Sequence, residues 1–200
     1  VAGGGVIFSQ AEDNLGDFAL KHGIPVVETQ AGKSALPQAH ALNFGASGVD
    51  GSAAANDLAA KADLVIGVGT RFQDFTTGSW ALFSHPARRV ISINVAAYDA
   101  VKHGAVPLVS DAKVALEKIT TALGDHRADD VALEGRQAWL DAVTAHCLPR
   151  ENTPDGYRPL DCEVIGAVQR ATGENAVAMC AAGTMPGALK LLWQASQGGY

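Results

Sequence analysis

The chain has 200 residues, of which 48% are apolar and 18% are charged, and its formal net charge is −6. This size and composition allow a substantial core in one large or two small domains. No run of lysines and arginines exceeds the pair Arg88-Arg89, which argues against a nucleic-acid-binding surface, because such a surface needs clustered cations. No apolar run approaches the length of a membrane span.

Strand and helix signals alternate through residues 1–124, the pattern of a parallel sheet flanked by helices. The predicted elements are a strand ending at residues 1–2 and a glycine turn over 3–5; a helix over 10–22, a strand over 25–29 and a loop over 30–51; a helix from 52 to 62 and strands over 63–69, 89–94 and 106–109; and a helix over 112–123. We therefore expect an α/β fold, a doubly wound parallel sheet of five or six strands.

Capping residues mark the ends of the predicted helices. Ser9, Ser52 and Ser110 precede them, and a serine hydroxyl can accept a hydrogen bond from a free N–H of the first turn. Gly23 is expected to end the first long helix. The proline within 106–109 indicates an edge strand.

The composition changes after Gly124. Residues 125–159 read as a linker that contains one amphipathic helix, predicted over 131–147. Residues 160–200 begin a new unit, with a helix over 160–172, a buried strand over 175–182, a turn over 183–187 and a helix over 188–197. Because this unit and the first strand are both incomplete, the chain is expected to be a fragment of a longer protein.

The apolar run from Leu64 to Val68 predicts a strand that is covered on both faces, as parallel sheets require. Gly67 and Gly69 at its end allow a tight turn and the close approach of another group. Arg71 follows at the carboxyl end of the strand, where open α/β sheets hold ligands. It could bind an anion through two parallel hydrogen bonds, or form a local ion pair with Asp74.

Two glycine segments resemble phosphate-binding motifs incompletely. Gly3-Gly4-Gly5 is placed like a dinucleotide-binding loop, but Phe8 stands where the third glycine belongs. Glu28 ends the next strand, where a ribose-binding carboxylate would sit, although acidic residues at such positions often bind nothing. Gly32-Lys33-Ser34 resembles a P-loop that lacks its first glycine. The alternative is a loop whose Lys33 points to solvent or to a neighbouring subunit.

Cysteine and histidine give no further chemistry. The three cysteines are odd in number and lack CxxC spacing, which argues against disulfides and zinc and favours a cytoplasmic location. The six histidines are scattered, so a metal site within this chain is not expected. There is no G-x-S-x-G nucleophile elbow and no evident acid–base machinery.

Several segments resemble the central domain of thiamine-diphosphate-dependent enzymes of the acetolactate-synthase group. They are residues 25–34, 48–51, 62–65 and 68–71, with Asn56. Residues 29–34 and 73–80 are similar, more specifically, to the branch of this group that hydrolyses the C–C bond of a cyclic 1,2-diketone in myo-inositol degradation. The similarity extends through 164–169, 180–183, 192–193 and 198–200, so that it covers almost the whole chain.

This resemblance implies a three-domain polypeptide in which residues 1–124 are the central domain and residues 160–200 begin the pyrophosphate-binding domain. It implies thiamine diphosphate and Mg²⁺ as cofactors of the full-length enzyme, bound between subunits of a homodimer or homotetramer. The activating glutamate and the Gly-Asp-Gly…Asn magnesium motif of the group lie in parts that this chain lacks. No catalytic residue and no metal ligand is therefore expected here. Gly183, Thr184 and Met185 are implied to approach the diphosphate at a helix start.

Some members of the group bind FAD or ADP in the central domain. Gly4, Gly69 and Arg71 match that cradle in outline, and the resemblance implies a vestigial, empty cleft. The implied substrate of the full-length enzyme is a small cyclic diketone, converted to 5-deoxyglucuronic acid. The chain itself is expected to be structural and inactive. The alternative is a nucleotide-binding (FAD, ADP or NAD) or regulatory module.

Overall fold

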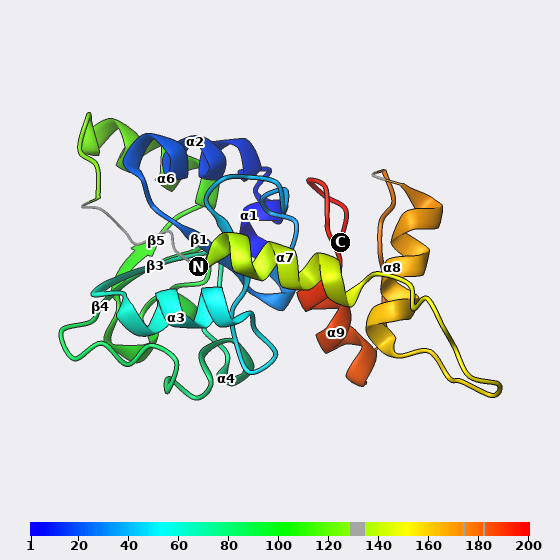
Figure 1. Cartoon of the computed structure of the whole chain (residues 1–200). Helices are drawn as coiled ribbons and strands as arrows, with labels where there is room; N and C mark the ends of the chain where they lie inside the picture. The colour runs from blue at the N-terminus through cyan, green and yellow to red at the C-terminus, as the bar shows by residue number, and fades with distance from the viewer. Residues whose placement is uncertain (129–134, 174, 182) are drawn as a thin grey trace.

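The computed structural model of the chain describes residues 1–128, 135–173, 175–181 and 183–200. Figure 1 shows the elements, which are α1 (Gly4–Phe8), α2 (Glu12–His22), β1 (Val26–Glu28), the 3₁₀ turn η1 (Gln30–Gly32), β2 (Asn43–Ala46), α3 (Ala53–Lys61), β3 (Leu64–Val68), α4 (Asp74–Thr77), β4 (Arg89–Asn94), α5 (Ala97–Ala100), η2 (Lys102–Gly104), β5 (Val106–Val109), α6 (Ala112–Leu123), α7 (Arg136–His146), α8 (Asp161–Thr172) and α9 (Thr184–Leu192).

The strands form one parallel arrangement joined through the first residues of the chain. β1 pairs with β2, and β3, β4 and β5 pair in that order, all in parallel. Ala2 bridges Glu28 of β1 and Val68 of β3, also in parallel. Counting Val1–Ala2 as the first strand, the order is 3-2-1-4-5-6, which is that of a doubly wound dinucleotide-binding sheet. The predicted fold class is confirmed.

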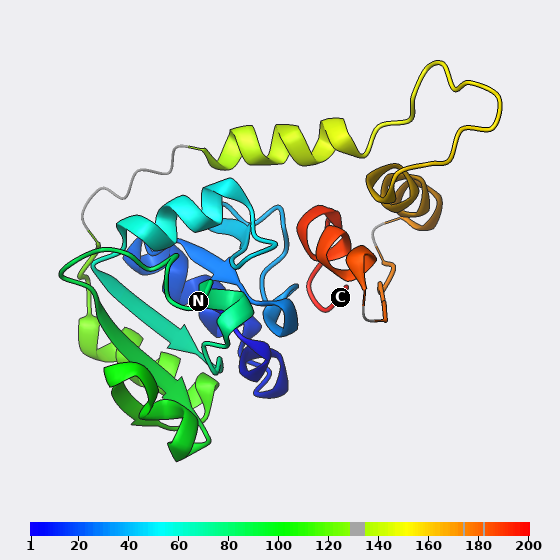
Figure 2. The ribbon, with the colours of Figure 1, turned by 90° about the horizontal axis from the view of Figure 1, so that it is seen from below.

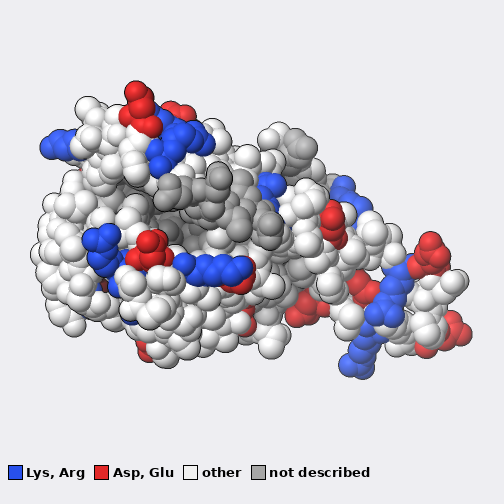
Figure 3. Space-filling view, turned by 60° about the vertical axis from the view of Figure 1, so that its left-hand side comes forward, with Lys and Arg blue, Asp and Glu red and all other residues white. Residues whose placement is uncertain are grey.

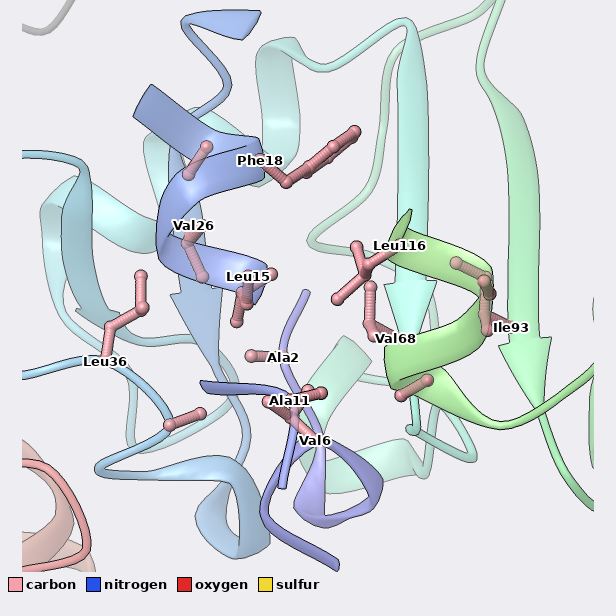
Figure 4. Packing of buried hydrophobic residues seen from close by; sticks show 14 of the residues in the cluster. Ala2, Val6, Ala11, Leu15, Phe18, Val26, Leu36, Val68, Ile93 and Leu116 are labelled. Carbon is pink, nitrogen blue, oxygen red and sulfur yellow. The ribbon is translucent and has the colours of Figure 1, made fainter. Parts of the chain in front are cut away.

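Alternate residues of the strands enter two different cores, one on each face of the sheet. Val26 and Val68 pack with Leu15 and Phe18 of α2 and Leu116 of α6 (Figure 4). On the other face, Val27 and Phe44 pack with α3 and with the helices of the carboxyl-terminal part. A third cluster joins Val65 and Val90 to residues after β3, among them Phe72 and Phe83.

The carboxyl-terminal part docks on the first domain through α7 and α9 (Figure 2). The Arg136 guanidinium of α7 donates to the carbonyls of Asn43, Gln38 and His40, at 2.8–3.1 Å. Trp139 lies against Gly45, where φ is +81° and an added Cβ would lie 2.3 Å from the indole. The glycine in β2 is therefore required by this helix.

Some predicted capping residues are confirmed and others are wrong. The Ser52 side chain accepts from Ala55 N–H, and Gly23 ends α2 in the left-handed conformation. α2 begins after Ala11 and not after Ser9, because residues 4–8 form the short helix α1 instead of a plain turn. Asp111 and not Ser110 caps α6, accepting from Val114 N–H. A carboxylate and a hydroxyl can both fill this position, so adjacent candidates are hard to rank.

Two segments differ more strongly from expectation. β2 lies inside the predicted loop, since its four residues have no long apolar run. The predicted buried strand over 175–182 is wrong for its described residues 175–181, which form no strand; Val177 is 68% and Met179 93% exposed. A buried strand needs neighbours to pair with, and the described residues provide none for this segment.

The boundaries of the last two helices also shift. α9 begins at Thr184 and ends at Leu192, so the predicted turn over 183–187 is largely its first turn, where Pro186 is tolerated. α7 begins at Arg136, and residues 131–134 of the predicted helix lie outside the described part. α8 agrees with its prediction. None of the helices in the described ranges is long and apolar enough to span a membrane.

The strand prediction for Leu64 to Val68 holds, but its burial is uneven. Leu64 is 41% exposed and Ile66 is half-buried, so the strand is not fully covered on both faces. β5 is exposed along its length, as expected of an edge strand. On the face shown in Figure 3, basic side chains are dispersed among acidic and uncharged ones.

Candidate functional site

The two loops at the switch point of the sheet touch each other through glycines. Gly5 N–H donates to Gly69 O at 3.0 Å, and Gly69 has φ +60°. A Cβ added to Gly69 would lie 2.4 Å from Gly5 Cα, and one added to Gly3 would lie 2.3 Å from Gly69 O. A Cβ on Gly4 would lie 3.0 Å from Ala31 O. The absence of a side chain at these glycines thus allows these loops to approach each other closely.

Gly67, the other glycine of the motif, serves a side chain. A Cβ at this position would lie 2.4 Å from the ring of Phe72, whose own φ is +49°. The Phe72 ring packs against Trp80 and Phe83, with centroids 5.4 and 6.4 Å away. The spacing of Gly67 and Gly69 is therefore explained by two separate internal contacts, one to a ring and one to a backbone.

Arg71 lies just beyond these contacts, exposed, and lines an open pocket of about 460 Å³. The other lining residues are Phe72, Gln73, Asp74, Phe75, Lys102 and His103. The alternative of an Arg71–Asp74 ion pair is not realised among the described residues. Lys102 pairs with Asp99 at 2.5 Å, so among the described lining residues the Arg71 guanidinium is left available to an anion.

A second polar site is buried where β1 ends. Glu28 is 2% exposed, and its carboxylate accepts from Leu36 N–H at 3.3 Å. Lys33 is 3% exposed, so the expectation that it points to solvent is wrong. Its Nζ lies 5.7 Å from the centroid of the Tyr200 ring and makes no hydrogen bond to the described residues. Lys190 of α9 is 5% exposed and donates to Ser47 O at 2.9 Å.

Burial and mutual charge set the pKa values in this cluster. Burial raises the pKa of Glu28 to about 7, against the opposing effects of the Lys33 charge and of nearby hydrogen-bond donors. Burial lowers the pKa of Lys33; the Glu28 carboxylate opposes this shift and the Lys190 charge adds to it. Burial also lowers the pKa of Lys190, opposed by Asp50. The buried hydroxyls of Ser34 and Ser47 have no hydrogen-bond partner in the described part of the chain.

The residues expected at the diphosphate lie at the start of α9 and are not among those that line the Arg71 pocket. Gly183 has φ +137°, no atom of the described residues lies within 4 Å of a Cβ added to it, and Thr184 begins the helix without a side-chain cap. Both are exposed and Met185 is half-buried. An uncapped helix N-terminus offers free N–H groups to an anion, so these residues fit a diphosphate group. Pro186 removes one donor from the same turn.

Sequence reasoning missed Lys190, Ser47 and Asn43. Lys190 stands in an apolar stretch of a predicted helix, the one available signal that it is buried. Asn43 donates to the carbonyls of Leu36 and Pro37 and accepts from Gly45 N–H, which shapes the loop around Glu28. Within the described ranges, no three His, Cys, Asp or Glu side chains gather as metal ligands would.

The comparison with known protein families agrees with the doubly wound fold described above. Residues 1–119 match the model of the thiamine pyrophosphate enzyme central domain, and the chain belongs to this family. Over 96% of its length the chain is 40% identical to the 3D-(3,5/4)-trihydroxycyclohexane-1,2-dione hydrolase of Geobacillus thermodenitrificans, covering 33% of that protein. It is 35% identical to the hydrolase of the same name from Clostridium perfringens, over 97% of this chain and 34% of that protein. The chain thus spans about a third of the length of these curated relatives.

Proposed function

We propose that the chain is part of a thiamine-diphosphate-dependent hydrolase that cleaves a C–C bond of 3D-(3,5/4)-trihydroxycyclohexane-1,2-dione, with uptake of one water, to give 5-deoxyglucuronic acid. The observation that carries this proposal is the 40% identity to a hydrolase of that name over 96% of the chain. The resemblance therefore includes the linker and the carboxyl-terminal segment as well as the family domain at residues 1–119.

The division of labour follows from where the side chains lie. The main-chain N–H groups of Thr184 and Met185 would hold the diphosphate of thiamine diphosphate, with Mg²⁺ held by residues elsewhere in the full-length enzyme. When bound, this cofactor supplies a carbon nucleophile and an electron sink for C–C cleavage. The chain's own part is to place the start of α9. Lys190, on the same helix, donates to Ser47 O and so attaches α9 to the loop after β2.

We also propose residues 1–124, 125–159 and 160–200 as central domain, linker and start of the pyrophosphate-binding domain. The helix α7 in the linker supports this division, since it packs on α3 and leads to α8. The full-length enzyme is proposed to be a cytoplasmic homodimer or homotetramer. Its three cysteines in this chain, Cys147, Cys162 and Cys180, are free thiols, which fits a reducing compartment.

Turnover assays test this assignment. The full-length polypeptide that contains the chain, supplied with thiamine diphosphate and Mg²⁺, is expected to convert the dione to the acid, measured by chromatography of the product. The 200-residue chain under the same conditions is expected to show none. Turnover by the chain alone would contradict the proposal that the catalytic residues lie elsewhere in the full-length enzyme. A full-length polypeptide that leaves the dione intact would overturn the hydrolase assignment.

A nucleotide-binding or regulatory module is the second candidate, and the Arg71 pocket favours it. The pocket lies at the carboxyl edge of a doubly wound sheet and contains an arginine without a partner among the described residues. An anionic ligand such as FAD, ADP or NAD could use this guanidinium. The glycines beside it already contact each other, which favours the vestigial cleft over an occupied one.

Calorimetric titration of the chain with FAD, ADP and NAD separates these possibilities. We expect no binding heat, the result of a purely structural role. If one nucleotide binds, the second candidate gains support, and Arg71→Ala should then weaken its affinity by about tenfold or more, since a charge-assisted hydrogen bond contributes about 1.5–3 kcal/mol. Arg158→Ala, at an exposed arginine outside the pocket, is the matched control and should leave the affinity unchanged.

A further inference from the structure

The buried charges of Glu28, Lys33 and Lys190 lie where the carboxyl-terminal segment meets the central domain. Glu28 ends β1 and Lys33 follows η1, whereas Lys190 comes from α9, more than 150 residues later in the chain. Figure 2 shows the red carboxyl-terminal segment beside the blue segment that follows β1. The cluster therefore joins two parts of the chain that are distant in sequence.

The carboxyl-terminal segment seals this cluster from water through several contacts. Gly198 N–H donates to Ser34 O at 3.3 Å, and Gln38 N–H donates to Ala195 O at 3.0 Å. The Tyr200 ring lies over Lys33, and the Tyr200 hydroxyl accepts from Gln30. Release of residues 184–200 would remove the Tyr200 ring from Lys33 and take Lys190 out of the interface. The charges left there would lie closer to water, which lowers the free-energy cost of a charge.

We propose that Glu28, Lys33 and Lys190 form a protonation-sensitive clamp that holds residues 184–200 on the central domain. The proposal rests on three charged side chains at an interface within the chain, each at least 95% buried. One of them, Lys33, makes no hydrogen bond to the described residues. The link of the clamp to catalysis, through the 183–185 loop at the start of α9, rests on the proposed function. The clamp itself does not, because it can be observed without cofactor or substrate.

The direction of the pH dependence follows from the pKa shifts. Burial raises the pKa of Glu28 to about 7 in the docked chain. Water that reached this carboxyl on release would bring its pKa down toward the ordinary value of 4.5, so docking would bind a proton. Docking therefore weakens as the pH rises from about 4.5 to 7, by at most about tenfold in the release equilibrium per pH unit. The pKa values of Lys33 and Lys190 are lowered, so docking strengthens again as the pH rises toward 10.5.

Other titratable groups face the cluster and enter the same balance. Asp50 lies beside Lys190 and favours its charged form. Tyr200 lies over Lys33, and burial raises the pKa of its phenol, so Tyr200 stays neutral over the pH range in which Glu28 loses its proton. In a plot of docking strength against pH, we therefore assign the fall at acid pH (the acid limb) to Glu28 and the rise at alkaline pH (the alkaline limb) to Lys33 and Lys190.

Hydrogen–deuterium exchange of the 193–200 peptide in the 200-residue chain, corrected for intrinsic exchange between pH 5 and 9, tests the clamp. Protection should fall from pH 5 to 7 and recover at alkaline pH. Glu28→Gln should remove the acid limb, and Lys33→Met should diminish the alkaline one. Glu151→Gln and Lys118→Met, at exposed positions, should reproduce the original profile.

A flat profile in the unmodified chain, or an acid limb that persists in Glu28→Gln, would overturn the clamp whether or not the full-length enzyme is active. A second readout is thiamine diphosphate affinity of the full-length polypeptide across the same pH range, which should follow the exchange profile. If the exchange profile is as expected but the affinity does not follow it, the clamp stands and its connection to the cofactor loop fails.

Discussion

Replacing Gly69 with alanine is expected to lower the free energy of unfolding by more than about 4 kcal/mol, a loss large enough to unfold many domains. Two costs combine at this position. The left-handed φ of +60° costs a non-glycine residue about 1–2 kcal/mol. The new Cβ would also lie 2.4 Å from Gly5 Cα, a backbone atom that moves only if the neighbouring loop moves with it.

Gly104→Ala is the matched control. Gly104 has φ +68°, and no atom of the described residues lies within 4 Å of its added Cβ, so this substitution should cost only the strain of the left-handed conformation, about 1–2 kcal/mol. Urea unfolding monitored by circular dichroism measures both variants. Equal losses at the two positions would show that the Gly5–Gly69 contact is less tight than described. An unchanged stability for Gly69→Ala, with lost nucleotide binding, would instead assign the glycine to a ligand.

The buried charges of Glu28 and Lys33, which act on each other's pKa, give the second large effect. At pH 8, Lys33→Met is expected to destabilise the chain by about 3 kcal/mol, because it leaves the Glu28 carboxylate buried without its compensating charge. The double variant Lys33→Met with Glu28→Gln should recover most of this loss, since the amide carries no charge and can still accept from Leu36 N–H. Lys118→Met, at an exposed lysine, should stay within about 0.5 kcal/mol of the original.

The same pair predicts how this loss depends on pH. Because the folded-state pKa of Glu28 is raised to about 7, the carboxyl group is protonated in the folded chain at pH 5. Its stabilising contribution is complete below about pH 4.5 and is lost as the pH rises to about 7. Lys33→Met should therefore cost much less at pH 5 than at pH 8. A loss that is equal at both pH values, or a double variant no better than the single one, would contradict a charge interaction.

Much of the fold could be predicted because its signals are local. The alternation of apolar runs with capped helices predicts the doubly wound sheet, and Ser52 and Gly23 take the predicted capping roles. The predictions fail where the secondary structure of a segment depends on the segments packed beside it. The run over 175–182 has the composition of a buried strand, yet its described residues form no strand, because no strand of the described chain lies beside them. β2 has little strand signal and forms because β1 and Trp139 lie next to it.

For the candidate sites too, some features could be predicted from the sequence and others could not. The strand ending at Gly69 and Arg71 could be placed at the carboxyl edge of the sheet, and that is where it lies. That its glycines contact each other is a matter of loop-to-loop distance, which no spacing in the sequence encodes. The P-loop resemblance of Gly32-Lys33-Ser34 left a solvent-facing lysine as its alternative, whereas Lys33 is buried under the Tyr200 ring, near enough to Glu28 for the two charges to interact.

The sequence by itself determined the fold class, the family and the order of the strands along the chain, because periodicity, glycines and caps act over a few residues. Only the tertiary structure decided which polar groups are buried together. Glu28 and Lys190 are 162 positions apart, and their environment depends on how α9 docks on the loop after β2. The burial of these groups is a property of that packing, since it depends on how completely other segments exclude water. Their pKa values, and the pH response expected from them, follow from this burial.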